Sequence, residues 1–308
     1  MKNIKQKELL IKTDIVTDLS YLGLIKITGA DAQQLLQGQF TNDISKVNTE
    51  QHQLSALCNH KGRIIVSFRI FQHEAAFYLL LPKESLAPVI KRLQMYVLRS
   101  AVKIEDASDN LARIGISGVN SEQILTDCLF APPTEIDANV TKDAITILRI
   151  AGTIPRYIIL GEKISIECFT KLAKLEDSQT WQLLDILAGL PTVGLATTEE
   201  FVPQMINYHN VNGVSFKKGC YTGQEIIARL HYLGEVKRQL YIAKIDSNET
   251  PQADDNLQAN EEKAGKIVNI APHPKGGFLI LASLIIKHVE TNDICWQQNV
   301  LKFIDNKL

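Results

Sequence analysis

Short apolar stretches alternate with polar turns along the first part of the chain, a pattern that predicts strands and helices in close succession. Gly29-Ala30-Asp31 leads from an apolar strand into a short helix, for which Asp31 is a suitable N-cap. Asn59-His60-Lys61-Gly62 separates two β-branched stretches and predicts a hairpin with glycine in the turn. The predicted strands here are Leu22–Thr28, Gln53–Cys58, Arg63–Phe71 and Ala75–Leu81, and the predicted helices are Asp31–Gln37 and Glu84–Val97.

The next hundred residues or so repeat this alternation with shorter segments. The predicted strands are Val102–Glu105, Leu111–Ser117, Ala144–Ile150, Arg156–Leu160 and Lys163–Ile166, and the predicted helices are Ser121–Leu129, Phe169–Leu175 and Gln179–Gly189. Strands that follow one another through hairpins favour antiparallel pairing over a steady βαβ rhythm. The pattern therefore predicts an α+β fold with split-βαβ units, and it argues against a doubly wound parallel sheet.

The pattern changes after Tyr241. Asp246–Glu262 is polar, acidic and rich in turn residues, and no clear helix follows it. The later predicted strands are Gly265–Ile270, Gly277–Leu284, Ile285–Glu290 and Val300–Ile304. We expect residues 239–308 to form a small C-terminal β-barrel. Residues 1–238 are expected to form the remainder of the protein as two α+β subdomains.

The charge balance changes this picture little. Lys and Arg total 33 against 34 for Asp and Glu, so the net charge of −1 argues against a general nucleic-acid coat. The apolar runs, such as Phe77–Leu81, are too short to span a bilayer, and the N-terminus lacks a secretory pattern. The 5 cysteines are widely spaced, which argues against a disulfide framework or a zinc knuckle. We therefore expect a cytoplasmic protein.

One segment carries candidate chemistry, namely residues 216–225 with the sequence FKKGCYTGQE. Two glycines bracket Cys220, lysines precede it, and a helical pattern begins after it. A thiol just before a helix N-terminus and near Lys217 and Lys218 would be favoured as thiolate. A lone cysteine is also commonly a small buried apolar residue, so spacing alone leaves both interpretations open.

The octapeptide Lys218–Glu225 resembles the signature of the YgfZ family, folate-binding relatives of the glycine-cleavage aminomethyltransferase. Further blocks resemble the same family in the same order. They are Gly29-Ala30-Asp31, Leu36-Gln37-Gly38-Gln39 with Thr41, Tyr96-Val97-Leu98-Arg99-Ser100, Phe201-Val202-Pro203-Gln204, Asn207, and Ser215-Phe216-Lys217. The resemblance runs from about Leu22 to Arg238.

The resemblance implies three domains in a ring around a central hole that holds tetrahydrofolate or another folate. It further implies an accessory role that supports iron–sulfur cluster enzymes and, through them, tRNA modification. Cys220 matches the key thiol of the family, and Lys218 and Glu225 flank it as candidate catalytic residues. Iron–sulfur enzymes or their assembly factors are the partners that this role implies, whereas membranes and direct nucleic-acid contact are not expected.

Folate needs flat apolar walls for its rings and positive charge for its glutamate tail. Trp181 resembles a tryptophan that the family links to folate, although a helix tryptophan packed between domains is an equal alternative. A second family tryptophan falls near Leu22, where Tyr21 could supply a ring, although adjacent strand residues face opposite ways. The remaining candidate folate residues are Gln204, Asn207, Tyr221, Gln224 and Arg229.

Two departures from the aminomethyltransferases argue against their chemistry. The paired aspartates that follow their hairpin are replaced by Val66 and Ser67, so no carboxylate can exchange protons with an amine. Leu187 occupies the position of a glutamate that hydrogen bonds the pterin. A folate-dependent aminomethyl or one-carbon transferase is thus only an alternative function. A direct tRNA-interacting module is a second alternative. Cys220, His209 and His231 match no zinc spacing, and no metal is expected.

Overall fold

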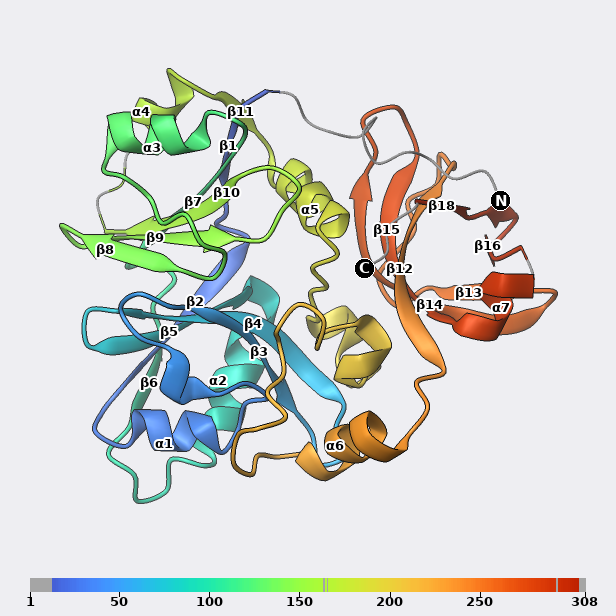
Figure 1. Cartoon of the computed structure of the whole chain (residues 1–308), viewed down its shortest axis with the longest axis horizontal. Helices are drawn as coiled ribbons and strands as arrows, with labels where there is room; N and C mark the ends of the chain where they lie inside the picture. Colours follow the sequence, from blue (N-terminus) through green and yellow to red (C-terminus); the bar gives the residue numbers. More distant parts are fainter. Residues whose placement is uncertain (1–12, 163, 165, 292, 305–308) are drawn as a thin grey trace.

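Figure 1 shows a computed structural model that describes residues 13–162, 164, 166–291 and 293–304 around three β-sheets. The first sheet is antiparallel throughout, in the order β3-β4-β5-β2-β6. Its strands are β2 (Leu22–Thr28), β3 (Gln53–Cys58), β4 (Ile64–His73), β5 (Ala76–Pro82) and β6 (Lys103–Asp106). Its helices are α1 (Ala32–Gln37), α2 (Leu86–Gln94) and the 3₁₀ turns η2 (Ile44–Lys46) and η3 (Lys83–Ser85).

These elements confirm the strands, the hairpin and the helices predicted for this region, apart from shifts at their ends. Asp31 precedes α1 but makes no side-chain cap bond. Its Oδ2 instead accepts a hydrogen bond of 2.7 Å from the backbone nitrogen of Ala101. Asp31 thus occupies the N-cap position of α1, as predicted, but its carboxylate ties the turn to the loop that precedes β6 and does not cap the helix.

The second sheet has the order β11-β1-β7-β10-β9-β8 and is antiparallel except for β1 and β11. Its strands are β1 (Ile15–Asp18), β7 (Ala112–Ser117), β8 (Asn139–Lys142), β9 (Ile145–Ile150), β10 (Arg156–Gly161) and β11 (Lys174–Glu176). Two helices, α3 (Ser121–Cys128) and α4 (Glu167–Thr170), pack against each other beside it. The parallel edge pair joins residues far apart in the sequence.

Two predictions fail in this sheet. The predicted helix Phe169–Leu175 is wrong, because the helix ends at Thr170 and β11 pairs with β1 near the chain start. The predicted strand Lys163–Ile166 includes Lys163 and Ser165, which lie outside the described residues. Ile166 precedes α4 in a helical conformation and belongs to no strand. Pairing with a distant strand overrides the local helical pattern here.

The third sheet is a nearly closed barrel of seven strands, in the order β17-β16-β13-β14-β15-β12-β18. The strands are β12 (Arg238–Ile245), β13 (Asn256–Ala259), β14 (Glu262–Pro272), β15 (Phe278–Ile285), β16 (Cys295–Trp296), β17 (Asn299–Val300) and β18 (Lys302–Phe303). The predicted barrel is confirmed. The predicted strand Ile285–Glu290 is wrong, because helix α7 (Ile286–Thr291) occupies that segment.

The segment between the second sheet and the barrel runs from near the centre of the molecule to its lower edge in Figure 1. It holds helix α5 (Ser178–Leu187), the 3₁₀ turns η4 (Leu195–Thr197) and η5 (Pro203–Ile206), and helix α6 (Gln224–Leu233). Helix α5 contacts β14 and β15 of the barrel and also β1 of the second sheet. The prediction of helix over Gln179–Gly189 is thus confirmed.

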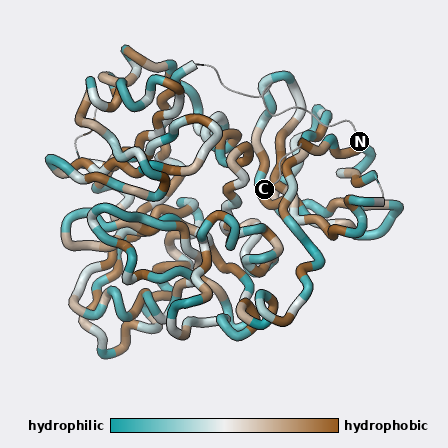
Figure 2. Tube along the Cα trace, in the orientation of Figure 1, coloured by the Kyte–Doolittle hydropathy of each residue, from teal (hydrophilic) through white to brown (hydrophobic). Residues whose placement is uncertain are grey.

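The central strands β5, β10 and β15 are buried on both faces, which explains their nearly continuous apolar sequences. Along β5, Tyr78 and Leu80 face a core shared by all three sheets, whereas Leu79 and Leu81 face the core of the first sheet. Strand β10 divides its side chains in the same alternating way, as does β15. Figure 2 shows the hydrophobic segments concentrated toward the interior. One shared apolar core therefore joins the three sheets.

A disulfide joins Cys128, at the end of α3, to Cys168 in α4, with a Cα–Cα distance of 6.0 Å. The expectation that the widely spaced cysteines stay unpaired is wrong for this pair, because the fold packs two helices 40 residues apart side by side. Cys58, Cys220 and Cys295 are free. Among the described residues, no helix is both long and apolar enough to cross a lipid bilayer.

Candidate functional site

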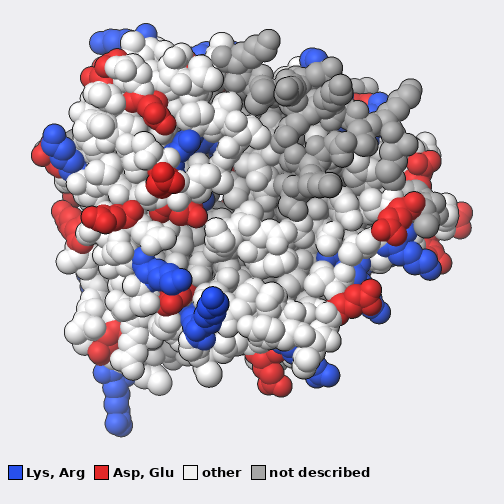
Figure 3. Space-filling view, in the orientation of Figure 1, with Lys and Arg blue, Asp and Glu red and all other residues white. Residues whose placement is uncertain are grey.

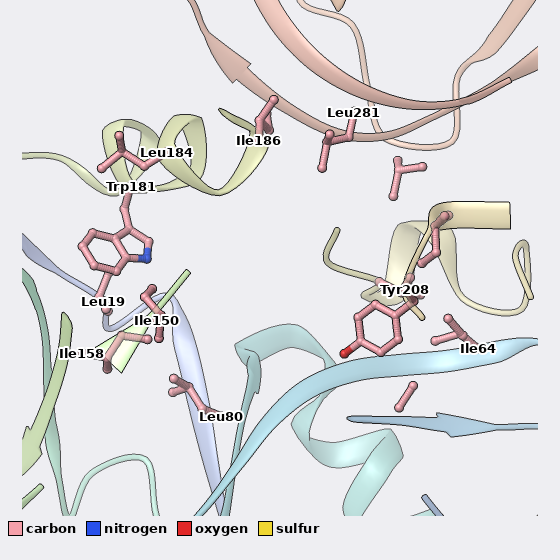
Figure 4. Packing of buried hydrophobic residues seen from close by; sticks show 14 of the residues in the cluster. Leu19, Ile64, Leu80, Ile150, Ile158, Trp181, Leu184, Ile186, Tyr208 and Leu281 are labelled. Carbon is pink, nitrogen blue, oxygen red and sulfur yellow. The ribbon is translucent and has the colours of Figure 1, made fainter. Parts of the chain in front are cut away.

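A cavity of about 310 Å³ lies where the three sheets meet. The first sheet forms one wall, β9 and β10 contribute to a second, and β14 and helix α5 close the space. Figure 4 shows the packed cluster at this junction, with Trp181 and Tyr208 on opposite sides of it. The polar residues lining the cavity are Tyr21, Ser67, Arg69, Glu84, Gln182, Asp185, Thr192, Tyr208 and Asn269. Ligand pockets in proteins have volumes of about 300 Å³ or more, so this cavity is at the lower end of that range.

Trp181 lines this cavity from helix α5 and is only 1% exposed. The Arg156 guanidinium carbon lies 4.3 Å from the centroid of its ring, a cation–π contact. A Cβ atom on Gly115 would lie 2.5 Å from the indole, so the strand residue behind the ring has to be glycine. Trp181 therefore combines both roles weighed from the sequence, since it packs between sheets and borders the cavity.

A buried ion pair holds a carboxylate at the cavity. Arg156 is fully buried, and its Nη2 donates a hydrogen bond of 2.7 Å to Oδ1 of Asp185. Asp185 lies four residues after Trp181 on helix α5, so the two side chains share a helix face. The spacing of Trp181 and Asp185 could be recognised in the sequence, whereas Arg156 lies 29 residues from Asp185 and no local pattern indicates it. Neither Asp185 nor Arg156 was predicted as a site residue.

Tyr21 and Leu22 both line the cavity, although neighbouring strand residues were expected to face opposite ways. The difference arises because Tyr21 precedes β2, which begins at Leu22, so the strand alternation does not apply to it. Burial raises the pKa of the Tyr21 hydroxyl, and the nearby Asp185 carboxylate raises it further. The hydroxyl therefore stays protonated and can donate a hydrogen bond.

The positions that differ from the aminomethyltransferases take structural roles. Ser67 lines the cavity, and its Oγ accepts a hydrogen bond of 2.8 Å from the backbone nitrogen of Val193. Val66 points to the other side of β4, into the core of the first sheet, and Leu187 is buried in the shared core. Glu84 and Asp185 are the carboxylates among the described lining residues.

The Lys218 side chain anchors the loop that carries Cys220. It is 8% exposed, and its Nζ donates hydrogen bonds of 2.7, 2.6 and 2.9 Å to the carbonyl oxygens of Gln37, Phe40 and Asn42. Burial lowers the pKa of this ammonium to about 8, while the Asp43 carboxylate raises it. Its hydrogens are thus used within the protein, whereas the Cys220 side chain is exposed.

The same loop interlocks with the hairpin between β3 and β4. Gly223 has φ +85°, and a Cβ there would lie 2.4 Å from the carbonyl oxygen of Asn59. Gly62 has φ +70° and lies against Gly223 and the first turn of α6. Both positions require glycine for their backbone conformation, and Gly223 also requires it for space. The hairpin thereby fixes the start of α6, four residues after Cys220.

The other predicted residues lie on this side of the molecule and do not line the cavity. Gln204 donates from Nε2 to the carbonyl oxygen of Ile227 in α6, and Oδ1 of Asn207 accepts from the backbone nitrogen of Leu240 in β12. Tyr221 is buried, and Gln224, Glu225 and Arg229 belong to α6, where Glu225 and Arg229 are exposed. The structure thus separates the predicted residues into a cavity group and a Cys220-loop group.

Aromatic rings surround the exposed end of α6. His231 stacks on Phe216 with ring centroids 3.7 Å apart, and Tyr232 meets both rings edge-on. Burial and the nearby His231 lower the pKa of His209. No cluster of three metal-binding side chains occurs within the described part of the chain.

Comparisons with known proteins agree with this geometry. The model of the GCVT N-terminal domain family matches residues 7–149. The aminomethyltransferase T of the Bartonella henselae glycine cleavage system has the same fold, with a TM-score of 0.72 at 15% identity. That match covers 98% of this chain and 88% of the other. The chain therefore has an aminomethyltransferase-like fold.

The family follows from closer relatives. The tRNA-modifying protein YgfZ of Colwellia psychrerythraea is 33% identical over 273 residues, which cover 87% of this chain and 84% of the relative. The protein of the same name from Photorhabdus laumondii is 34% identical over 239 residues, covering 77% and 72%. The chain belongs to the YgfZ family.

Proposed function

We propose that this chain is a folate-binding accessory protein that supports iron–sulfur enzymes and, through them, tRNA modification. The cavity carries the proposal, because it combines aromatic walls with a half-buried, ion-paired carboxylate in a space of about 310 Å³. Trp181, Tyr21 and Leu22 supply flat or apolar surface for the rings of tetrahydrofolate.

Asp185 supplies the polar recognition in this proposal. A pterin presents neighbouring N–H donors from its amino group and its ring, and a carboxylate can accept two such bonds. Leu187 cannot accept a hydrogen bond, whereas Asp185 lies two residues earlier and is held at the cavity by Arg156. Asp185 thus provides the hydrogen-bond acceptor that the aminomethyltransferases have as a glutamate at the position of Leu187.

Cys220 is proposed to act as the key thiol for client proteins. It lies on the exposed part of a loop. The buried Lys218 side chain anchors this loop, and the contact between Gly62 and Gly223 fixes it. An exposed thiol on a rigid loop is accessible to another macromolecule, which a cavity residue is not. Glu225 at the first turn of α6 is suitably placed to stabilise the helix start.

The role in tRNA modification is proposed to be indirect. The relatives from Colwellia and Photorhabdus carry the name tRNA-modifying protein. Acidic and basic side chains are interspersed over the face shown in Figure 3, without the single-sign surface that phosphate binding favours.

Aminomethyl transfer is disfavoured because Val66 and Ser67 replace the paired aspartates. Purified protein should accordingly release no ammonia from an aminomethylated lipoyl carrier.

Binding of tetrahydrofolate, followed by calorimetry and tryptophan fluorescence, tests the proposal. The chain has 2 tryptophans, and Trp296 lies in the barrel, where its Nε1 donates to Asp255. Trp181→Phe should weaken binding by roughly 1–3 kcal/mol, because part of the apolar wall is lost. Trp296→Phe is the matched control and should bind as the parent protein does. Absence of binding to the parent protein would refute the folate proposal.

A cytoplasmic location belongs to the same proposal, because free thiols and iron–sulfur proteins both favour a reducing compartment. The Cys128–Cys168 disulfide argues the other way, since such bonds are rare in reducing compartments. Alkylation of thiols in intact cells, followed by mass spectrometry, decides the matter. Cys58, Cys220 and Cys295, which are free in the structure, should be recovered as alkylated thiols, and quantitative oxidation of Cys220 would contradict a cytoplasmic location.

A further inference from the structure

The cavity has two electrostatically different sides. Burial and the charge of the nearby Asp185 raise the pKa of Tyr21, whereas burial raises the pKa of Tyr208 and the charge of the nearby Arg69 opposes that rise. Tyr208 lies across the cluster from Trp181 (Figure 4). Among the described lining residues, Arg69 is the only lysine or arginine. One side of the cavity therefore presents the Asp185 carboxylate, which is paired with Arg156, and the other presents the Arg69 guanidinium, which is paired with Asp137.

The Arg69 guanidinium is held in a fixed orientation. It is 7% exposed, and its Nη1 donates to Nδ1 of His52 at 3.1 Å and to Oδ1 of Asp137 at 3.2 Å. Burial and the charge of Arg69 lower the pKa of His52 well below its usual value, so the ring is neutral. Since Nδ1 accepts, the proton is on Nε2, which donates to the carbonyl oxygen of Arg149 at 3.0 Å.

Both hydrogen bonds found for Arg69 among the described residues use Nη1. A guanidinium has five N–H donors in a planar fork that matches the two oxygens of a carboxylate. The donors on Nε and Nη2 are therefore available to a carboxylate that enters the cavity.

We propose that Arg69 binds a carboxylate of the glutamate part of the folate. This inference rests on the proposed function and specifies how the ligand lies in the cavity. A folate has its N–H donors at the pterin end and its carboxylates at the glutamate end. Asp185 offers a hydrogen-bond acceptor to the first end, whereas the guanidinium of Arg69 offers donors to the second. The pterin thus lies toward Trp181 and Asp185, and the glutamate toward Arg69 and Tyr208.

A purely structural role for Arg69 makes a different prediction. The Arg69–Asp137 pair joins β4 of the first sheet to the segment before β8 of the second, so it also stabilises the contact between the sheets. Loss of that contact would weaken the binding of every ligand in the cavity equally. Only a direct bond to the ligand makes affinity depend on the charge of the glutamate.

The experiment compares 5-formyltetrahydrofolate with its diamide, in which both glutamate carboxylates are carboxamides. The parent protein should bind the acid about tenfold or more tightly than the diamide, the usual scale for a charge-assisted bond. Arg69→Gln should bind both ligands with nearly the affinity of the diamide. Arg69→Lys should recover part of the preference. Arg99→Gln, at an exposed arginine outside the cavity, is the control and should keep the full preference.

Each outcome decides a separate question. Equal binding of acid and diamide by the parent protein overturns the role of Arg69 and leaves folate binding intact, even if the variants do not fold. A preference for the acid that survives in folded Arg69→Gln also overturns it. Failure of the parent protein to bind either ligand refutes the proposed function itself. A preference that disappears only in the Arg69 variant supports the assignment.

Discussion

Lys218 and Cys220 are two residues apart, yet their side chains lie in opposite environments. The ammonium of Lys218 is buried among three carbonyl oxygens, and the thiol of Cys220 is exposed. Gly219 between them has no heavy atom within 4 Å of a Cβ position. The spacing of the motif thus has a physical basis, because an inward anchor and an outward thiol need a short, unobstructed link.

The anchor makes a prediction about stability. Lys218→Met should lower the free energy of unfolding by about 1–3 kcal/mol, because three buried carbonyl oxygens lose a charged donor. Lys217→Met, at the exposed neighbouring residue, should change it by no more than about 0.5 kcal/mol. Urea denaturation of the two variants measures the difference. Equal stability of both variants would show that the three bonds contribute nothing net.

The thiol makes a prediction about reactivity. Iodoacetamide should modify Cys220 first, because its side chain is exposed, whereas Cys58 is fully buried and burial raises its pKa. Cys220→Ser should keep the parent stability and lose the rescue of iron–sulfur enzyme activity in cells that lack the protein. Cys295→Ser is the control and should retain the rescue. Full rescue by stable Cys220→Ser protein would remove the thiol from the function.

Residues whose importance lies in local spacing could be predicted from the sequence, and residues defined by distant partners could not. Trp181 and Tyr21 were predicted from the resemblance, and the structure places both at the cavity. Asp185 was not predicted as a site residue, because its ion pair is with Arg156, which lies on β10 of the second sheet. Arg69 was missed for the same reason, since His52 and Asp137 reach it from other segments.

At the scale of elements, the start of α6 depends on the hairpin between β3 and β4. Gly223→Ala should destabilise the protein by about 1–3 kcal/mol, since φ +85° strains any other residue and the added Cβ meets the Asn59 carbonyl. Gly219→Ala, in open space on the same loop, should cost much less. Thermal unfolding monitored by circular dichroism compares them. Indistinguishable midpoints would contradict the interlock.

Long apolar strands could be predicted because burial on both faces leaves a nearly continuous hydrophobic run, as in β5 and β15. The errors concern short segments whose state is set by tertiary contacts. β11 has only 3 residues and exists because β1 pairs with it. Helix α7 follows directly on β15, so its apolar residues read as a continuation of the strand. Neither segment carries enough local pattern to decide its own structure.

At the scale of the whole molecule, the three sheets share one core, so we expect them to unfold together and to respond together to pH. Burial lowers the pKa of four histidines distributed over the sheets and the central segment, namely His52, His73, His209 and His273. In the unfolded chain these rings titrate near pH ~6.5. Below that pH the unfolded state binds more protons than the folded state, so acid favours unfolding.

The free energy of unfolding should therefore fall as the pH drops from about 6.5 toward 5. The fully buried His52 alone contributes a slope of about 1.4 kcal/mol per pH unit in that window. The carboxylates with lowered pKa, Asp43, Glu200 and Asp246, begin to take up protons only below this range, so they do not mask the effect.

Urea denaturation at half-unit pH intervals gives the slope. His52→Gln should reduce it by about one proton, and His60→Asn, at an exposed residue of the hairpin, should leave it unchanged. A stability independent of pH between 7 and 5 would show that these rings are not held neutral by the fold.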